Sequence, residues 1–314
     1  MIKERNKEKI KTGQAKKWKQ QATLQIMALP AVICLLLFSI YPLFGLQIAF
    51  KDYKLNMGIM GSEWAGLKYF KMILTDPNML NVMKNTIGLS VIKAFVTFPL
   101  PVIFALMLQE VRWSKFKRTV QTVSYFPYFL SWSIISLMAT AWLSTDGFIN
   151  SFLTSCGILD KPYFFLGKPE AFWGISIVLD IWKNLGYSAI IYLAAMSGVD
   201  QEVMEAAVID GAGRLGRMWH VTIPAILPTI MILLIMNTGN LLKGGSNFDI
   251  SYNLSNTLNL STSEILDTYV LKTGITLGRF SYATAIGLCQ SVVSTILLLV
   301  SNGVSKATTG EGYF

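Results

Sequence analysis

Six long apolar runs dominate the sequence and restrict the folds that it can adopt. Each run is uncharged or nearly uncharged and is long enough to cross roughly 30 Å of hydrocarbon as a helix. Because backbone N–H and C=O groups find no water in lipid, we expect all six runs to be helices. The alternating ten-residue pattern of a membrane β-barrel is not visible. The runs lie near residues 24–50, 86–109, 120–143, 171–198, 223–242 and 282–302.

The composition also predicts an all-α integral membrane protein. Of the 314 residues, 53% are hydrophobic and 14% are charged, whereas soluble domains carry about 25% charged residues. The first run is too long for the apolar core of a cleaved signal peptide, and no A-x-A-like site follows it. We therefore expect a membrane anchor there, preceded by a basic tail.

The basic residues predict the orientation of the chain. Positive residues favour the cytoplasmic side of a membrane, so both termini and the loop 198–222 are expected inside the cell. Five lysines in the first external loop run against this pattern. The supporting cations include Arg112, Lys115, Lys117, Arg118, Arg214 and Arg217, and the opposing lysines are Lys51, Lys54, Lys68, Lys71 and Lys84.

These assignments predict three segments along the chain. They are a basic cytoplasmic tail over residues 1–23, a six-helix transmembrane domain over 24–302 and a short cytoplasmic tail over 303–314. The eight cations of the first tail are interspersed with Glu4 and Glu8. We interpret this tail as a juxtamembrane anchor and not as a nucleic-acid site.

A charged segment separates the fourth and fifth runs. It reads Glu205-Ala-Ala-Val-Ile-Asp210-Gly-Ala-Gly and is followed by Val221-Thr-Ile-Pro224. We expect a helix over 201–209 with Asp200 as N-cap, a break at Gly211 and Gly213, and a second short helix over 214–219. Small alanines in the first helix permit close approach of a partner, and its carboxylates offer hydrogen bonds. The alternative is an ordinary amphipathic helix at the membrane surface.

This segment resembles the EAA coupling loop of permease subunits in bacterial ATP-binding-cassette (ABC) importers. The resemblance extends over most of the chain, from about Leu24 to Asn302. Further matching stretches begin at Asn85, Phe116 and Trp182. Together they are similar to polysaccharide and oligosaccharide permeases of the lipoprotein-linked type, which are related to maltose-type permeases.

The resemblance implies a type I ABC importer permease with six transmembrane helices in a bacterial cell membrane. It implies a second homologous permease, two ATP-binding-cassette ATPase subunits and an extracellular lipid-anchored sugar-binding protein as partners, and an oligosaccharide or polysaccharide fragment as cargo. Which glycan is carried is not written in the sequence. The implied ATPase-coupling residues are Glu205, Ala206, Ala207, Asp210, Gly211 and Ala212.

The sequence holds no motif for ATP chemistry or for an enzyme. Glycines 239 and 244 have the spacing of a phosphate-binding loop, but Gly245 stands where that loop needs a lysine. ATP and Mg²⁺ are therefore expected on a partner ATPase, with no cofactor in this chain. One histidine, His220, and three scattered cysteines give no metal-binding cluster.

Polar groups within the runs are candidates for a substrate pathway, because such groups are costly in lipid. Asp180 and Lys183 are three residues apart, and we expect them to form an ion pair, with a structural or a pathway role. Sugars bind to aromatic faces and to amides. For each aromatic alone, core or interface packing is the commoner role. The pathway candidates are Tyr128, Trp132, Asn184, Tyr187, Asn237 and Asn240.

Two other functional classes remain open at this point. A stand-alone secondary transporter or channel needs no ATPase, but it leaves the Glu205 segment unexplained. A membrane-bound enzyme needs a convergent catalytic set, and none is visible in the sequence.

Overall fold

The computed structural model describes residues 21, 22 and 24–309. The chain divides after Tyr69 into two compact units. Unit 1 denotes the described residues up to Tyr69, and unit 2 denotes those from Phe70 to Thr309. Five helices are long and apolar enough to cross a membrane, or six if one bent pair counts as a span.

Unit 1 consists of a long helical segment, Leu24–Phe50, and a small hairpin. The segment agrees with the first predicted run and ends in a π-helical turn, η1 (Leu36–Ile40), and a 3₁₀ helix, η2 (Tyr41–Phe50). Its apolar side chains are largely exposed, as expected for a surface that lies in lipid. In the hairpin, β1 (Lys51–Asp52) pairs antiparallel with β2 (Glu63–Trp64) around the short helix α2 (Gly58–Gly61).

Four spans of unit 2 agree with predicted runs, although their ends differ. The second begins nine residues earlier than predicted, at Pro77, because Asp76 caps that end by accepting a hydrogen bond from Asn78 N (3.0 Å). The spans are α4 (Pro77–Thr97) with α5 (Pro99–Gln109), α9 (Pro169–Ser197), α11 (Arg214–Arg217) with η5 (Met218–Thr222) and α12 (Ile223–Gly239), and α16 (Phe280–Thr309).

The predicted third run is not one helix. Residues 120–143 belong to two helical segments, Ser114–Phe129 and Trp132–Ser155, which meet at a bend of 100°. Pro127 lacks a backbone N–H, and Ser131 starts a new helix by accepting a hydrogen bond from Ile134 N (3.2 Å). The segments comprise α6 (Ser114–Tyr125), η3 (Phe126–Phe129), α7 (Trp132–Leu143) and α8 (Phe148–Ser155).

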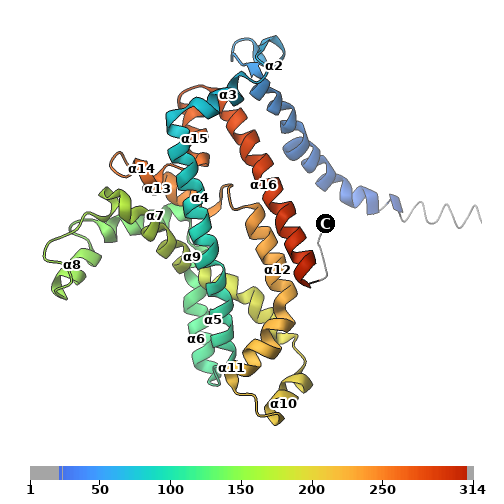
Figure 1. The fold of residues 1–314 in the computed structure, drawn as a ribbon, viewed down its shortest axis with the longest axis vertical. Helices are drawn as coiled ribbons and strands as arrows, with labels where there is room; N and C mark the ends of the chain where they lie inside the picture. The colour runs from blue at the N-terminus through green and yellow to red at the C-terminus, as the bar shows by residue number, and fades with distance from the viewer. Residues whose placement is uncertain (1–20, 23, 310–314) are drawn as a thin grey trace, which may run out of the picture. The chain divides into compact units, whose positions relative to one another are not determined.

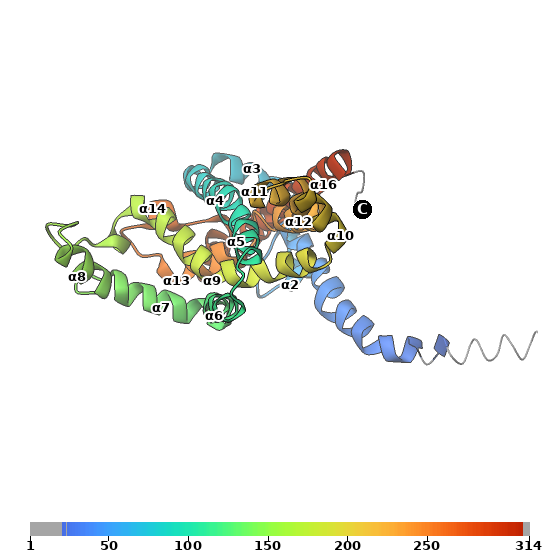
Figure 2. The same cartoon turned by 90° about the horizontal axis from the view of Figure 1, so that it is seen from below.

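The connection between α7 and α9 and the connection between α12 and α16 contain helices of their own. Figures 1 and 2 show α7 and α8 projecting sideways from the spans of unit 2, with α13 and α14 beside them. The remaining elements are α3 (Lys68–Thr75), η4 (Phe165–Gly167), α10 (Gln201–Ile209), α13 (Gly245–Leu254), α14 (Leu260–Ser263), α15 (Leu266–Leu271) and η6 (Lys272–Thr276).

Helix α9 is the centre of unit 2, because two apolar cores form on it. One core packs Phe172 of α9 against Ile135 of α7 and Ile250 of α13. The other packs Ala189 of α9 against Ala105 of α5 and Ile226 of α12. The polar middle of α9 lies between these two cores.

Candidate functional site

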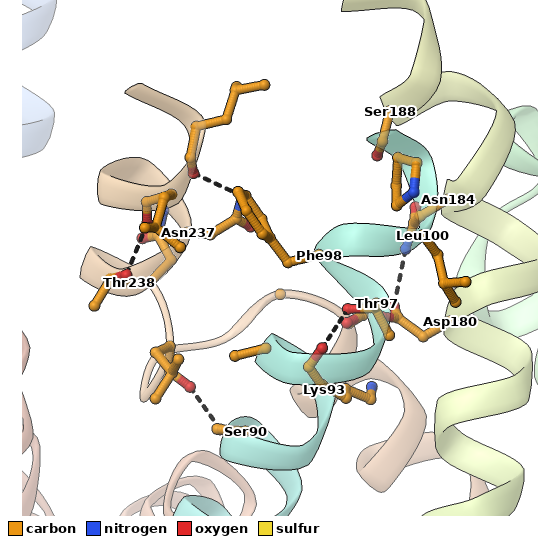
Figure 3. A pocket seen from close by; sticks show the side chains of 18 of the residues that line it. Ser90, Lys93, Thr97, Phe98, Leu100, Asp180, Asn184, Ser188, Asn237 and Thr238 are labelled. Carbon is orange, nitrogen blue, oxygen red and sulfur yellow. Dashed lines mark hydrogen bonds between the residues drawn. The ribbon is translucent and has the colours of Figure 1, made fainter. Parts of the chain in front are cut away.

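A cavity of about 330 Å³ lies between spans α4–α5, α9 and α12 of unit 2, and residues 240–247 form one wall (Figure 3). About half of its lining residues are polar or charged. The polar lining residues are Ser90, Lys93, Thr97, Asp180, Asn184, Ser188, Tyr192, Asn237, Thr238, Asn240, Lys243, Ser246 and Asn247.

The structure brings three of the predicted pathway residues, Asn184, Asn237 and Asn240, to this cavity. Asn184 Nδ2 donates to Oδ1 of Asp180 (2.8 Å), which lies one turn earlier on α9. Asn237 and Asn240 donate to carbonyls of their own helix, those of Leu233 (2.8 Å) and Met236 (3.1 Å). Each side-chain nitrogen is thus partly satisfied locally, which limits the cost of an amide in lipid.

The three predicted aromatic residues do not line the cavity. Tyr128 and Tyr187 stack on each other with ring centroids 3.6 Å apart. The Lys183 ammonium lies 5.4 Å from the ring centroids of both Tyr128 and Trp132. These side chains form a separate group, which we call the bend cluster: Tyr128, Trp132, Lys183 and Tyr187.

The bend cluster also shows that the predicted ion pair between Asp180 and Lys183 is wrong. Lys183 Nζ donates instead to the carbonyl of Tyr128 (2.8 Å) and to that of Leu130. The 100° bend removes these carbonyls from a regular helix, so they need a donor from elsewhere. Sequence spacing alone could not reveal that these carbonyls bind Lys183 in place of Asp180, because they are freed by a break in another helix.

Sequence analysis missed the residues that α4 and residues 241–247 bring to the cavity. Lys93 lies inside the predicted second run, and a single charge in an otherwise apolar run is itself a signal of function. Residues 243–247 lie beyond the fifth predicted run, which ends at residue 242. Their turn depends on glycine, because Gly244 and Gly245 have φ angles of +47° and +60°.

Hydrogen bonds from three helices hold this wall of the cavity. Ser90 Oγ donates to the carbonyl of Leu241 (2.6 Å), and Gly244 N donates to Asp267 Oδ2 (2.6 Å). Gln290 Nε2 donates to the carbonyl of Leu242 and to Asp267 Oδ1, the latter at 3.0 Å. We call residues 241–244 the clamped segment.

The predicted helix over 201–209 is present as α10, and Asp200 caps it by accepting a hydrogen bond from Glu202 N (2.9 Å). None of its residues is buried, and Ile209 is 85% exposed. The break that follows requires glycine, because Gly211 has a φ of +82°. Figure 1 shows α10 at the end of unit 2 opposite α15.

The second short helix differs from the prediction. Helix α11 does not stop at residue 219 but continues through η5 into α12, so that Arg214–Gly239 is one helical segment of 26 residues. Pro224, which lacks a backbone N–H, lies directly after the π-helical turn η5, where the hydrogen-bond pattern of this helical segment changes. Glu110, at the end of α5, lies 3.7 Å from Arg214 Nε and 3.9 Å from Arg217 Nη2.

The candidate coupling residues therefore lie on and just after α10. Glu205, Ala206, Asp210 and Gly211 are exposed, whereas Ala207 and Ala212 are half-buried. Glu205, Arg217 and Glu110 share a groove of about 290 Å³ beneath this helix. The structure thus presents an exposed helix, α10, followed after a glycine break by α11, which two ion pairs hold against the end of α5 and which continues into a membrane span.

Comparison with known proteins identifies the family of this chain. Residues 72–308 match the family described as binding-protein-dependent transport system inner membrane component. The chain is 42% identical to the polygalacturonan/rhamnogalacturonan transport system permease protein YteP of Bacillus subtilis (strain 168), over 94% of this chain and 91% of the relative. It is 40% identical to protein LplB of the same organism, over 94% and 92%.

Two solved structures of bacterial ABC transporters also resemble this chain. The chain resembles, with a TM-score of 0.86 and 32% identity, a chain of a bacterial ABC transporter involved in the import of the acidic polysaccharide alginate. The match covers 94% of this chain and 98% of that one. A bacterial alginate ABC transporter in complex with an alginate pentasaccharide-bound periplasmic protein gives a TM-score of 0.87 at 33% identity, covering 95% and 98%.

The fold and the family match together define a membrane permease of the type I ABC importer class. The chain belongs to the binding-protein-dependent transport system inner membrane component family. It is accordingly a transport subunit in a cell membrane and not an enzyme, and the stand-alone secondary transporter or channel is set aside.

Proposed function

We propose that the chain carries oligosaccharides or polysaccharide fragments across a bacterial cell membrane. The observation that carries this proposal is the polar cavity between α4–α5, α9 and α12. Its amides and hydroxyls suit the hydroxyls of a sugar, and a cavity of at least about 300 Å³ is typical of small-molecule sites. The relatives support a sugar cargo, because their names refer to polygalacturonan, lactose and arabinooligosaccharides.

The energy for transport comes, in this proposal, from ATP and Mg²⁺ on a separate ATPase that docks on α10. The absence of a phosphate-binding loop from the sequence supports a separate ATPase. The exposed, unburied surface of α10 supports docking at this helix. The contact residues proposed are Glu205, Ala206, Ala207, Asp210, Gly211 and Ala212.

Movement of the docked helix has a direct path to the cavity. The segment Arg214–Gly239 has 26 helical residues and is therefore about 39 Å long at 1.5 Å per residue. It begins beside α10 and carries Asn237 at its far end. A tilt imposed at α10 would thus displace one wall of the cavity, which is the movement that alternating access requires.

The complete importer, as proposed, contains two such ATPases, a second homologous permease and an extracellular lipid-anchored sugar-binding protein. Both termini lie on the cytoplasmic side, together with α10. The largely exposed apolar surface of Leu24–Phe50 supports further contacts within lipid. The family name supports dependence on a binding protein.

Purification of the tagged chain in mild detergent tests the assembly. We expect a second permease of the same class and a Walker-motif ATPase to co-purify. The variant Glu205→Lys should release the ATPase and abolish uptake while the two permeases stay together. Glu202→Lys, on the same helix, is the matched control, since Glu202 is not among the proposed contact residues. Recovery of the chain alone, active without ATP, would contradict the proposal.

A further inference from the structure

The connection between α5 and α6 and the first turn of α6 carry a dense group of cations. Four cations lie within seven residues: Arg112, Lys115, Lys117 and Arg118. Residues 111–145 contain no aspartate or glutamate that could balance them locally. Figure 1 shows the start of α6 at the same end of unit 2 as α10 and α11. The positive charge is therefore concentrated at one end of the spans.

These four side chains form no ion pair within the described part of the chain, counted to 4.0 Å. The nearest carboxylate in the sequence, that of Glu110, lies instead beside Arg214 and Arg217 of α11. Of the four cations, only Lys117 is half-buried, and the other three are exposed. The cations of α11 are thus paired, whereas those of α6 are available to a partner outside this chain.

Two large aromatic side chains lie among these cations. Trp113 and Phe116 stack with their ring centroids 6.1 Å apart and their planes 12° from parallel. Trp113 is 68% exposed and Phe116 is 50% exposed. Water alone is a poor neighbour for two such rings, and tryptophan is typical of the boundary between lipid and water. We call the four cations and these two rings the basic patch.

The rest of α6 shows at which depth the basic patch lies. One side of this helix packs on α9, where Gly186 permits close approach, because a Cβ there would lie 2.2 Å from the carbonyl of Ser124. The opposite side exposes Val123 and Phe126, an apolar surface that suits hydrocarbon. Phe126 is ten residues beyond Phe116, or about 15 Å along a helix. The basic patch therefore lies at the level of the lipid headgroups.

We propose that the basic patch binds the phosphate headgroups of anionic phospholipids, in the leaflet on the α10 side of the membrane. Its cations pair with lipid phosphates, and the rings of Trp113 and Phe116 lie between headgroups and acyl chains. Charge complementarity supports this occupant, because clusters of four or more cations at the end of a membrane span attract anionic lipid. The inference goes beyond sugar transport and does not depend on the cargo.

The test compares two lipids with the same acyl chains and different headgroup charge. The permease, together with the subunits that co-purify with it, is titrated in neutral detergent with dioleoylphosphatidylglycerol or dioleoylphosphatidylcholine. Native mass spectrometry counts the bound lipid. The wild type should bind the anionic lipid at least about tenfold more tightly. This preference should shrink as the ammonium acetate concentration rises, because salt screens exposed charges.

A double variant assigns the preference to the basic patch. Lys115→Gln with Arg118→Gln removes two exposed cations of one helical turn. Each cation near an anionic surface contributes about fivefold to the affinity, so phosphatidylglycerol should bind roughly 25-fold more weakly and phosphatidylcholine almost as before. The matched control is Lys161→Gln with Lys168→Gln, two exposed lysines between α8 and α9. It should bind both lipids as the wild type does.

Two outcomes would overturn the inference directly: equal affinity of the wild type for both lipids, or a preference that the double variant retains. Loss of the ATPase from the double variant with unchanged lipid binding would show a protein contact in place of a lipid site. If the double variant cannot be purified, Lys115→Gln alone gives the same test, with an expected loss of about fivefold. None of these results bears on sugar uptake, which tests the proposed function separately.

Discussion

Two buried lysines of unit 2 have opposite surroundings. Lys183 on α9 donates to two carbonyls at the bend before α7 and lies against two aromatic rings. Lys93 on α4 lines the cavity and has no hydrogen-bond partner among the described residues. Both are 5–6% exposed, so burial alone does not distinguish them. The difference lies in the partners: hydrogen bonds hold Lys183 to the backbone, whereas only the nearby carboxylate of Asp180 attracts Lys93.

The largest effect is expected from Lys183→Met. It removes two charge-assisted hydrogen bonds and leaves two carbonyls of the bend without a donor, a loss of about 3 kcal/mol. Thermal unfolding in detergent measures it, and the midpoint should fall clearly below that of the wild type. A variant as stable as the wild type would show that the bend does not depend on this lysine.

Asn237→Leu changes the cavity without touching the bend cluster. It should lower sugar uptake about fivefold, the equivalent of one lost hydrogen bond, while assembly with the partner subunits is unchanged. Uptake by proteoliposomes and co-purification give the two readouts. Asn253→Leu is a suitable control, since Asn253 likewise donates to a carbonyl of its own helix (2.6 Å) but does not line the cavity. Normal uptake by Asn237→Leu would remove this residue from the pathway.

Lys93→Met completes the comparison of the two lysines. Lys93 Nζ makes no hydrogen bond, but the buried carboxylate of Asp180 attracts it. We therefore expect a loss of unfolding free energy smaller than that of Lys183→Met, because no hydrogen bond is broken but Asp180 loses its counter-charge. A destabilisation as large as that of Lys183→Met would mean that Lys93 has a structural role.

The smallest effect concerns a carboxylate outside the spans. Asp76 accepts hydrogen bonds from the hydroxyls of Tyr269 (2.7 Å) and Tyr282 (2.6 Å). Burial acts to raise its pKa, but the two tyrosine hydrogen bonds, the hydrogen bond from Asn78 N and the positive charge of Arg279 together hold the pKa of Asp76 below its ordinary value of 3.8. A lowered pKa in the folded state stabilises the protein at neutral pH, and this stabilisation is lost as pH falls through that range.

The variant Asp76→Asn tests this contribution. It should lower the unfolding midpoint by about 2–4 °C at pH 7, and the difference from the wild type should shrink as pH falls below about 4. Thermal unfolding at several pH values measures the difference. A gap that is constant from pH 7 to pH 3 would show that the ionised carboxylate is not what stabilises this junction.

Local features of the sequence predicted much of this molecule. Apolar length located five spans, and Asp200 with Gly211 predicted the start and end of α10. These two inferences succeeded since each depends on residues that are close together in the chain. Three amides of the apolar runs line one cavity, and their role in a substrate pathway stays a prediction.

Non-local contacts account for what the sequence did not predict. At the 100° bend Lys183 contacts the backbone, and the lysine lies 53 residues from Leu130, one of its carbonyl partners. The same distant contact invalidated the expected pairing with Asp180. The clamped segment likewise depends on Ser90 and Gln290, which no spacing rule associates with residues 241–244.

The clamped segment has a consequence for passive leakage. A polar cavity inside a membrane gives ions and small solutes a path down their gradients unless its walls stay closed. Three hydrogen bonds hold residues 241–244, from Ser90, from Gln290 and to Asp267. At about 1 kcal/mol each, breaking them together makes the open state roughly 150 times rarer than the closed one. We therefore expect this wall to move rarely unless transport supplies about 3 kcal/mol to break the three hydrogen bonds.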